Sequence, residues 1–254
     1  MLLEGKNAVI YGGGGAIGTA VASAFAREGA RVFLAGRTRA ALDRAAERIQ
    51  ADGGRADGGR VDVAEVDALD ERAVREHADA IVATAGRLDI SFSLISMGDV
   101  QGTPLAELSL ADFEQPVLTT LRSTFITAQA AARHMIRQGS GVILMFGGYG
   151  DPAANVGGLQ VAFGAVEALR RGLARELGPH GIRVLTLQTG GIPETLPEDF
   201  EPRQAIADDI AAKTMLGRAA TLADVGHVAA FAASDYARSM TATALNITCG
   251  ATVS

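Results

Sequence analysis

Short apolar runs alternate with amphipathic segments from one end of the chain to the other. The apolar runs have the length and uniform hydrophobicity of strands that are buried on both faces. The amphipathic segments repeat apolar residues every three or four positions, which is typical of helices packed on a core. The strand-like runs are 8–10, 31–35, 60–67, 88–95, 141–146, 182–188 and 243–248. The helix-like segments are 21–27, 40–50, 70–84, 109–137, 160–177 and 221–233.

Strands that alternate with helices predict a parallel sheet covered by helices on both faces. No linker or internal repeat divides the 254 residues, and α/β chains of this length often form one domain. We therefore expect a single α/β domain over residues 1–254, a Rossmann-type doubly wound fold with a mainly parallel sheet of about seven strands flanked by helices. Ligands of such sheets bind at the carboxyl ends of the strands. The polar segment 193–217 is expected to cover a substrate there.

Composition excludes several functional classes. Hydrophobic residues make up 48% of the chain and charged residues 20%, which excludes a disordered protein. A net charge of −6 provides no basic surplus to displace counterions, so we expect no nucleic-acid partner. The single cysteine, Cys249, excludes an internal disulfide and a Cys-rich zinc site, and no histidine has ligand spacing to another histidine or to a carboxylate. No signal-like start and no long apolar run are present, so the expected location is the cytoplasm, with no membrane partner.

Glycine accounts for 31 residues, and one cluster of them has an informative position. The segment 11–18, Tyr-Gly-Gly-Gly-Gly-Ala-Ile-Gly, follows the first strand and opens the first helix. Glycine lets a backbone approach a pyrophosphate, and the helix N-terminus supplies N–H groups and the positive end of a dipole. A flexible turn is the alternative interpretation. The nucleotide-binding interpretation predicts contacts from Gly12, Gly14, Gly15, Ala16 and Ile17.

The second strand ends at Ala35-Gly36-Arg37. Dinucleotide-binding units often place an acid at this position to bind the ribose 2′-hydroxyl, whereas a 2′-phosphate favours the planar charged fork of arginine. Arg37 therefore favours NADP(H) over NAD(H) as the cofactor. A solvated surface arginine is the alternative.

With these motifs in place, the sequence resembles the short-chain dehydrogenase/reductase family over essentially its whole length. The glycine loop is similar to the family's TGxxxGIG, with Tyr11 in place of Thr and Ala16 in place of the middle Gly. Residues 66–70 resemble the adenine-contacting DVTD, and residues 93–96 occupy the place of NNAG in a degenerate form. Residues 167–184 match the stretch after the family's catalytic helix very closely. The resemblance implies cofactor contacts from Asp67, Ala68, Ser93, Ile95, Thr189, Gly190 and Ile192.

The resemblance breaks at the residues that perform the family's chemistry. The family uses an Asn, a Ser, a Tyr and a Lys, in which the lysine lowers the pKa of the tyrosine and binds the nicotinamide ribose. The tyrosine and lysine positions hold Leu159 and Phe163 in this chain. The serine position holds Gly148, and the asparagine position holds Thr120. All four roles are vacant by this alignment.

The lysines and tyrosines of the chain show, without an alignment, that the family's Tyr–Lys pair is absent. The chain has two lysines, Lys6 and Lys213, and neither follows any of the three tyrosines at the spacing of a YxxxK motif. Tyr149, in the loop after strand 141–146, is the best remaining candidate for a proton donor, and a structural or pocket-lining tyrosine is the alternative. Asp151 is a further candidate, for which a turn-forming aspartate is the alternative.

Two functional hypotheses follow. The first is a divergent NADP(H)-dependent oxidoreductase that acts on a small organic substrate, such as a polarised C=C or C=N bond, with a different acid or with water as the proton source. Ketone reduction is harder, because a developing alkoxide needs a donor. The second is a redox-silent protein on the same fold: a lyase, a cyclase, an isomerase or a cofactor-binding regulatory subunit. The family usually forms dimer contacts through helices 109–137 and 160–177, which implies a homo-oligomer, a dimer or tetramer.

Overall fold

The computed structural model describes residues 1–52, 60–147 and 153–252. Within these residues, seven parallel strands form one sheet in the order β3-β2-β1-β4-β5-β6-β7, which confirms the predicted fold. The strands are β1 (Asn7–Tyr11), β2 (Arg31–Gly36), β3 (Val61–Glu65), β4 (Ile90–Ser93), β5 (Gly141–Gly147), β6 (Ile182–Gln188) and β7 (Thr243–Asn246). The α-helices are α1 (Ala16–Arg27), α2 (Arg39–Ala51), α3 (Glu71–Ala85), α4 (Leu110–Gln138), α5 (Leu159–Leu177), α6 (Arg203–Ala212) and α7 (Leu222–Ala233). Three short 3₁₀ turns are η1 (Gly178–His180), η2 (Pro193–Thr195) and η3 (Asp235–Ala237).

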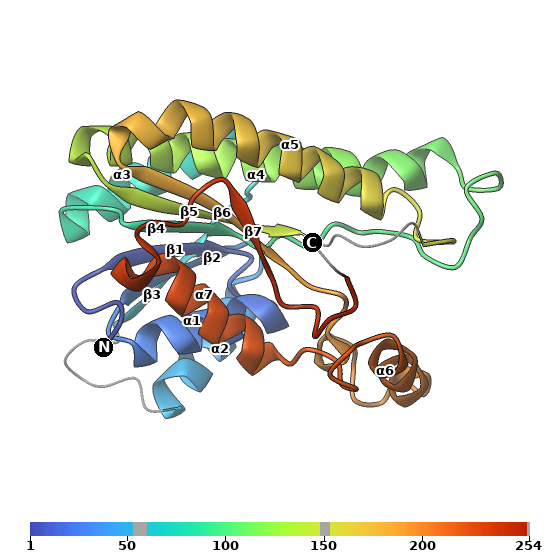
Figure 1. The fold of residues 1–254 in the computed structure, drawn as a ribbon. Helices are drawn as coiled ribbons and strands as arrows, with labels where there is room; N and C mark the ends of the chain where they lie inside the picture. The colour runs from blue at the N-terminus through green and yellow to red at the C-terminus, as the bar shows by residue number, and fades with distance from the viewer. Residues whose placement is uncertain (53–59, 148–152, 253–254) are drawn as a thin grey trace.

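Helices cover the sheet on both faces (Figure 1). The apolar side chains of α1, α2 and α7 form one buried cluster with one face of the strands. Those of α3, α4 and α5 form a second cluster with the other face. Because both faces of the central strands are buried, those strands read in the sequence as continuous apolar runs.

The order of the strands reverses between β1 and β4. β1 pairs with β2 on one side and with β4 on the other, so Tyr11 lies beside both Ala35 and Ser93. The connections that leave β1 and β4 run to opposite faces of the sheet, and this leaves an opening above the carboxyl ends of these two strands. Ligands of doubly wound sheets bind at such a switch point.

Polar caps and glycines define the ends of the helices on the α3–α4 face. The Asp70 carboxylate accepts hydrogen bonds from the first-turn N–H groups of α3, and that helix ends at Gly86 with φ of +80°. Ser109 caps α4 in the same way, and Gly139 ends it with φ of +68°. Asp and Ser supply acceptors for the unpaired N–H groups, and glycine adopts the left-handed conformation with little strain. These caps explain why the predicted boundaries of both helices lie within about a residue or two of the observed ones.

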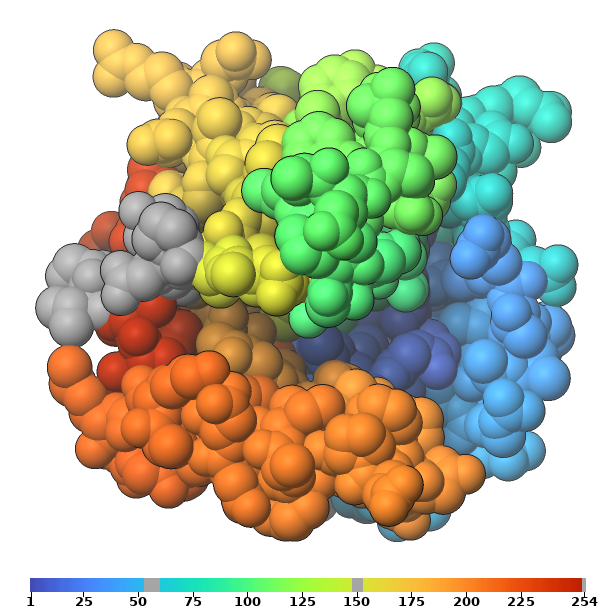
Figure 2. Space-filling model, turned by 90° about the vertical axis from the view of Figure 1, so that its right-hand side faces the viewer, coloured from blue at the N-terminus to red at the C-terminus, as the bar shows by residue number. Residues whose placement is uncertain are grey.

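The segment 193–217 contains a helix, α6, that the hydrophobic pattern does not predict. None of the residues of α6 is buried, so the helix has no apolar face to signal it. α6 projects beyond the carboxyl end of the sheet (Figure 1). Figure 2 shows the opening at this end of the molecule, between the orange segment that contains α6 and the green and yellow segments opposite it.

Two negative findings apply to the part of the chain that the structure describes. No helix there is long and apolar enough to cross a membrane. No group of three or more histidine, cysteine, aspartate or glutamate side chains is placed to hold a metal ion there.

Candidate functional site

Two adjoining cavities lie at the carboxyl ends of the strands. The outer groove, of about 430 Å³, runs along the glycine loop and the ends of β2 and β3. The inner pocket, of about 310 Å³, lies between the start of α1, the end of β4 and the side of α4. Both cavities are lined by Gly15, Leu94, Ile95, Ser96 and Met97. One elongated molecule can therefore extend through both cavities.

The glycine loop is fixed between β2 and β4. Gly12 has φ of +83°, and a Cβ atom at this position would lie 2.1 Å from the carbonyl oxygen of Leu94. The N–H groups of Gly12 and Gly13 both donate to the carbonyl oxygen of Ala35, at 2.8 and 3.1 Å. Only glycine fits position 12, because any side chain would collide with the backbone of the neighbouring strand end.

The N-terminus of α1 opens toward both cavities. Its N-cap residue is Gly15, which has no side chain to bond the first-turn N–H groups, and no acid lies in the first turn. Ala16 and Ile17 line the inner pocket, and the Thr19 hydroxyl donates to the Gly15 carbonyl oxygen at 2.8 Å. An uncapped helix start without an acid leaves its N–H groups and dipole available to an anion. This loop therefore has room and donors for the pyrophosphate of a dinucleotide.

Arg37 lines the outer groove at the end of β2. Its side chain is exposed, and no ion pair is found for it in residues 1–52, 60–147 and 153–252. The nearby Arg39 is instead bound to Asp43, with Nε 2.9 Å from Oδ1. Thr38 is the N-cap residue of α2, but its hydroxyl makes no capping bond. This corner of the groove thus combines a free guanidinium with an available hydroxyl, a set suited to a phosphate group.

Asp67 and Ala68 line the outer groove after β3. The exposed Asp67 carboxylate accepts a hydrogen bond from the Leu69 N–H at 3.0 Å, which fixes the turn between β3 and α3. Ala68 is buried. Both residues lie where the sequence predicts an adenine contact, on the same groove as Arg37.

The inner pocket combines an apolar wall with several hydroxyl groups. Ile17, Met97 and Phe146 contribute apolar surface, and Ser93 and Thr120 contribute hydroxyls. The Thr120 hydroxyl is buried and has no hydrogen-bond partner in the described part of the chain. A buried hydroxyl without a partner carries a desolvation cost that a ligand can relieve.

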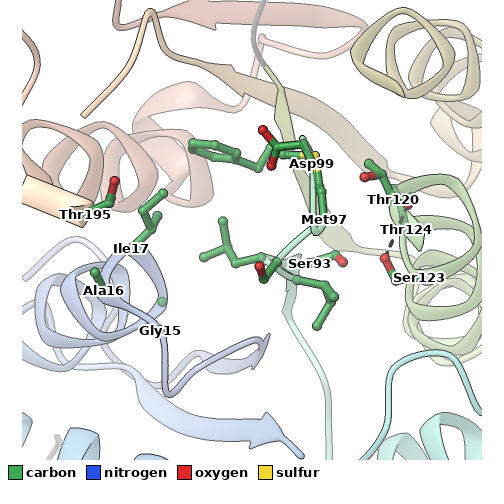
Figure 3. Close-up of a pocket in the computed structure, with 15 residues that line it drawn as sticks. Gly15, Ala16, Ile17, Ser93, Met97, Asp99, Thr120, Ser123, Thr124 and Thr195 are labelled. Atoms are coloured by element: carbon green, nitrogen blue, oxygen red, sulfur yellow. Dashed lines mark hydrogen bonds between the residues drawn. The ribbon is translucent and has the colours of Figure 1, made fainter. Parts of the chain in front are cut away.

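Asp99 is a pocket residue that sequence reasoning missed. It follows β4 in an irregular segment and is half-buried, and Gln101 donates to its Oδ2 at 2.6 Å. In Figure 3 its carboxylate points across the pocket toward the side formed by Ile17 and Thr195. The available signal was its place shortly after a strand that ends at the switch point, where ligand-binding loops concentrate.

The candidate proton-transfer residues fall in two groups. Tyr149, with Gly148 and Asp151, lies outside the described residues. Leu159 is the first residue of α5, and Phe163 follows one turn later with its side chain partly buried. Phe163 is absent from the described lining of the inner pocket.

The residues after β6 that are predicted to contact the cofactor have different surroundings in the structure. The Thr189 N–H donates to the Gly147 carbonyl oxygen at 3.2 Å, and Gly190 packs near Thr248. The Ile192 side chain is buried in the α1–α7 hydrophobic cluster and lines neither described cavity. Thr195, three residues further on, is the residue of this segment that lines the inner pocket.

The other tyrosine near the loop is structural. Tyr11 is fully buried at the end of β1, and its ring meets the edge of His77 on α3 at a centroid distance of 5.9 Å. Burial raises the pKa of Tyr11 and lowers the pKa of His77 to about 4. Neither group lines the inner pocket in the described structure.

Both lysines form ion pairs away from the cavities. Lys6 precedes β1 and lies 3.7 Å from Asp235, at the end of the sheet opposite the switch point. Lys213 follows α6 and pairs with Asp209. Neither ammonium lines the described cavities.

His134 contacts a carboxylate that lies far from it in the sequence. His134 on α4 lies beside a carboxylate of another helix, with Nε2 2.9 Å from Oδ1 of Asp79 on α3. Arg133 pairs with the same carboxylate. Burial, followed by the charge of Arg133, holds the pKa of His134 below its usual value. The contact joins two helices that are far apart in sequence, so residue spacing could not reveal it.

Comparison with known proteins gives one family match and close structural similarity. The profile of a family described as enoyl-(acyl carrier protein) reductase matches residues 14–252. Gluconate 5-dehydrogenase from Gluconobacter oxydans is 30% identical over 255 residues, covering 99% of this chain and 96% of that protein.

Two solved structures have the same fold. A short-chain type dehydrogenase/reductase from Mycobacterium ulcerans superposes with a TM-score of 0.89 at 26% identity, covering 99% of this chain and 91% of that one. An NAD⁺-bound xylitol dehydrogenase superposes with a TM-score of 0.86 at 24% identity, covering 98% and 100% of the two chains. At that identity the second similarity shows the fold alone.

Proposed function

This chain belongs to the short-chain dehydrogenase/reductase family of oxidoreductases, and we propose that it is a divergent member that prefers NADP(H) and transfers protons without the family's Tyr–Lys pair. The observation that carries the proposal is the outer groove. There an uncapped helix start and the unpaired Arg37 line one continuous surface.

The residues of the outer groove fit the adenosine half of NADP(H). The first-turn N–H groups of α1 would hold the pyrophosphate, and Gly12 and Gly14 leave room for it. Arg37 and Thr38 would bind the 2′-phosphate, and Asp67 would contact the adenine. When bound, the nicotinamide would supply or accept a hydride, and the protein positions it beside the substrate.

The inner pocket supports a different way of moving the proton. The sequence contains no YxxxK, and both lysines form ion pairs outside the described cavities. Tyr149 stays the sequence-based candidate for a proton donor, with water as the other source. Without a cation beside it, a tyrosine with a pKa near ~10 is a poor base but a usable acid at neutral pH. Reduction of a polarised C=C or C=N bond therefore fits better than reduction of a ketone.

The first test is nucleotide preference. We expect NADPH to bind more tightly than NADH in a titration followed by nicotinamide fluorescence. Arg37→Ala should weaken NADPH binding about tenfold or more, with little effect on NADH, because only the 2′-phosphate loses a charged partner. Arg48→Ala is the matched control, since Arg48 is an exposed arginine on α2 that does not line the outer groove. Equal weakening of both nucleotides by Arg37→Ala would contradict the preference, and no binding of either would contradict the proposed function.

The second test separates catalysis from cofactor binding alone. A panel of enones, imines, ketones and polyhydroxylated acids such as gluconate would be assayed with NADPH and NADP⁺. Turnover of any member supports the oxidoreductase, and Tyr149→Phe should then lower kcat more than it changes nucleotide affinity. Tight NADPH binding with no turnover would favour the redox-silent alternative, which the vacant Tyr and Lys positions also suggest.

We also propose that the protein is a homo-oligomer, a dimer or a tetramer. Apolar side chains are exposed along α4 and at the start of α5: Leu118, Phe125 and Ile136 are 52%, 46% and 40% exposed, and Val161 is 48% exposed. Covering such residues would release apolar surface from water. Sedimentation that shows only a 26.1 kDa species at micromolar concentration would contradict this. The cytoplasmic location stays a prediction from the sequence.

A further inference from the structure

We propose that the inner pocket binds a substrate whose reacting nitrogen is positively charged, an iminium ion, and that Asp99 pairs with this charge. This inference rests on the proposed function, because the substrate would lie beside the nicotinamide in the same site.

The charge of the pocket is the first argument. Among the described residues that line the pocket, Asp99 is the one charged side chain, and the remainder are apolar, hydroxyl-bearing or glycine. An anionic substrate would therefore meet an unpaired carboxylate, whereas a cationic one would meet its counter-charge.

The setting of Asp99 is the second argument. Gln101 binds only Oδ2, so one carboxylate oxygen is left for a ligand. Figure 3 shows the carboxylate facing the side of the pocket where Ile17 lies in the first turn of α1. Met97 and Phe146 provide apolar surface in the same pocket. Apolar surroundings reduce screening by water, and an ion pair is stronger there than on an open surface.

The third argument is that reduction of an iminium ion needs no proton donor, so the missing Tyr–Lys pair is not required. When an iminium carbon accepts a hydride from the reduced nicotinamide, a C–H bond forms and the π pair of the C=N bond becomes the nitrogen lone pair. The product is a neutral amine, and no proton is delivered in this step. In the reverse direction an amine loses hydride to the oxidised nicotinamide and becomes an iminium ion, which a carboxylate stabilises.

The test compares two probes with the same ring skeleton, the cation N-methyl-3,4-dihydroisoquinolinium and the neutral 1,2-dihydronaphthalene. Binding is measured by calorimetry to protein saturated with NADP⁺, so that no reduction occurs. We expect the wild-type protein to bind the cation about tenfold or more tightly than the neutral probe, and this ratio to fall toward one in Asp99→Asn. Added salt should also bring this ratio of affinities closer to one, because the carboxylate is only half-buried.

Glu107→Gln is the matched control. Glu107 lies in the same segment between β4 and α4, is exposed, and does not line the pocket, so its loss should leave the ratio unchanged.

Equal affinity for the two probes in the wild-type protein would overturn the inference even if NADPH binds as proposed. If the Asp99→Asn variant still binds the cation more tightly than the neutral probe, and its NADPH affinity is unchanged, the inference is overturned too. If the protein binds no nucleotide, the proposed function fails, and the ratio measured without nucleotide still tests Asp99. With NADPH, reduction of the cation to its N-methyl tertiary amine is the second readout.

Discussion

The glycine loop and the Thr120 side of the inner pocket differ in whether their polar groups are hydrogen-bonded within the described structure. Around the glycine loop, the N–H groups of Gly12 and Gly13 share the Ala35 carbonyl oxygen, and the Thr19 hydroxyl bonds Gly15. In the inner pocket the buried hydroxyl of Thr120 has no hydrogen-bond partner in the described structure.

The glycine loop is therefore suited to one fixed part of a ligand. The inner pocket, in contrast, completes its hydrogen bonds only when a substrate binds. A preorganised loop loses little freedom when a pyrophosphate binds, so affinity is high and the local sequence is tightly constrained. A pocket with a buried, unpaired hydroxyl discriminates between ligands instead, because a ligand that leaves this hydroxyl unpaired forfeits binding energy. Specificity should therefore reside mainly in the inner pocket.

The largest expected effect tests the rigidity of the outer groove. Gly12→Ala should destabilise the protein by at least about 3 kcal/mol or abolish nucleotide binding, because its Cβ would meet the Leu94 carbonyl oxygen at 2.1 Å. Gly86→Ala is the control: its φ is +80°, but nothing lies within 4 Å, so a cost of about 1 kcal/mol is expected. Chemical denaturation and NADPH titration measure the two effects. A similar loss of stability in both variants would show that the backbone can move to accommodate a methyl group at position 12.

The next effect tests the packing beneath the loop, where His77 contacts Tyr11. The folded-state pKa of His77 is about 4, below its usual 6.5, so between these values the unfolded chain binds a proton that the folded chain does not. Stability is therefore full above pH ~6.5 and falls as the pH drops toward 4, by about 2 kcal/mol for this residue after allowance for partial exposure. His77→Phe should flatten this part of the profile in denaturation curves measured from pH 4 to 8.

His180→Gln is the control for that experiment, because His180 is exposed in a 3₁₀ turn. His134 has a pKa shifted in the same direction, so a smaller slope should persist in His77→Phe. A wild-type profile that is flat from pH 4 to 7 would show that the histidines stay accessible to protons in the folded state.

The smallest effects compare a hydroxyl bonded to the glycine loop with a hydroxyl of the inner pocket. Thr19→Val removes a hydroxyl that donates to Gly15 and should cost about 1 kcal/mol of folding free energy. Thr120→Val removes a buried hydroxyl without a partner and should be neutral or stabilising by up to about 1 kcal/mol. Thermal denaturation of both variants without ligand checks the contrast. Destabilisation of equal size in both would mean that the inner pocket is as fully hydrogen-bonded as the loop.

Much of the fold could be predicted because most elements carry a local signal in the sequence. Apolar runs indicated the strands, and the glycine loop and Arg37 fall on the same groove because strand ends converge at the switch point. α6 could not be predicted, since it buries none of its residues. Asp99 was missed because an irregular loop has no period to mark which residues face inward. The predicted cofactor contact of Ile192 would have to come from its backbone, because its side chain packs into the core.

The scarcity of lysine makes the molecule simple to label. Reductive methylation with ¹³C would introduce only two side-chain resonances, in addition to that of the terminal amine. Lys6 would report on the end of the sheet opposite the switch point, where it pairs with Asp235. Lys213 would report on the end of α6, beside the opening to the cavities. The scarcity of lysine thus supplies a fixed reference signal and a signal from the end of α6 within one spectrum.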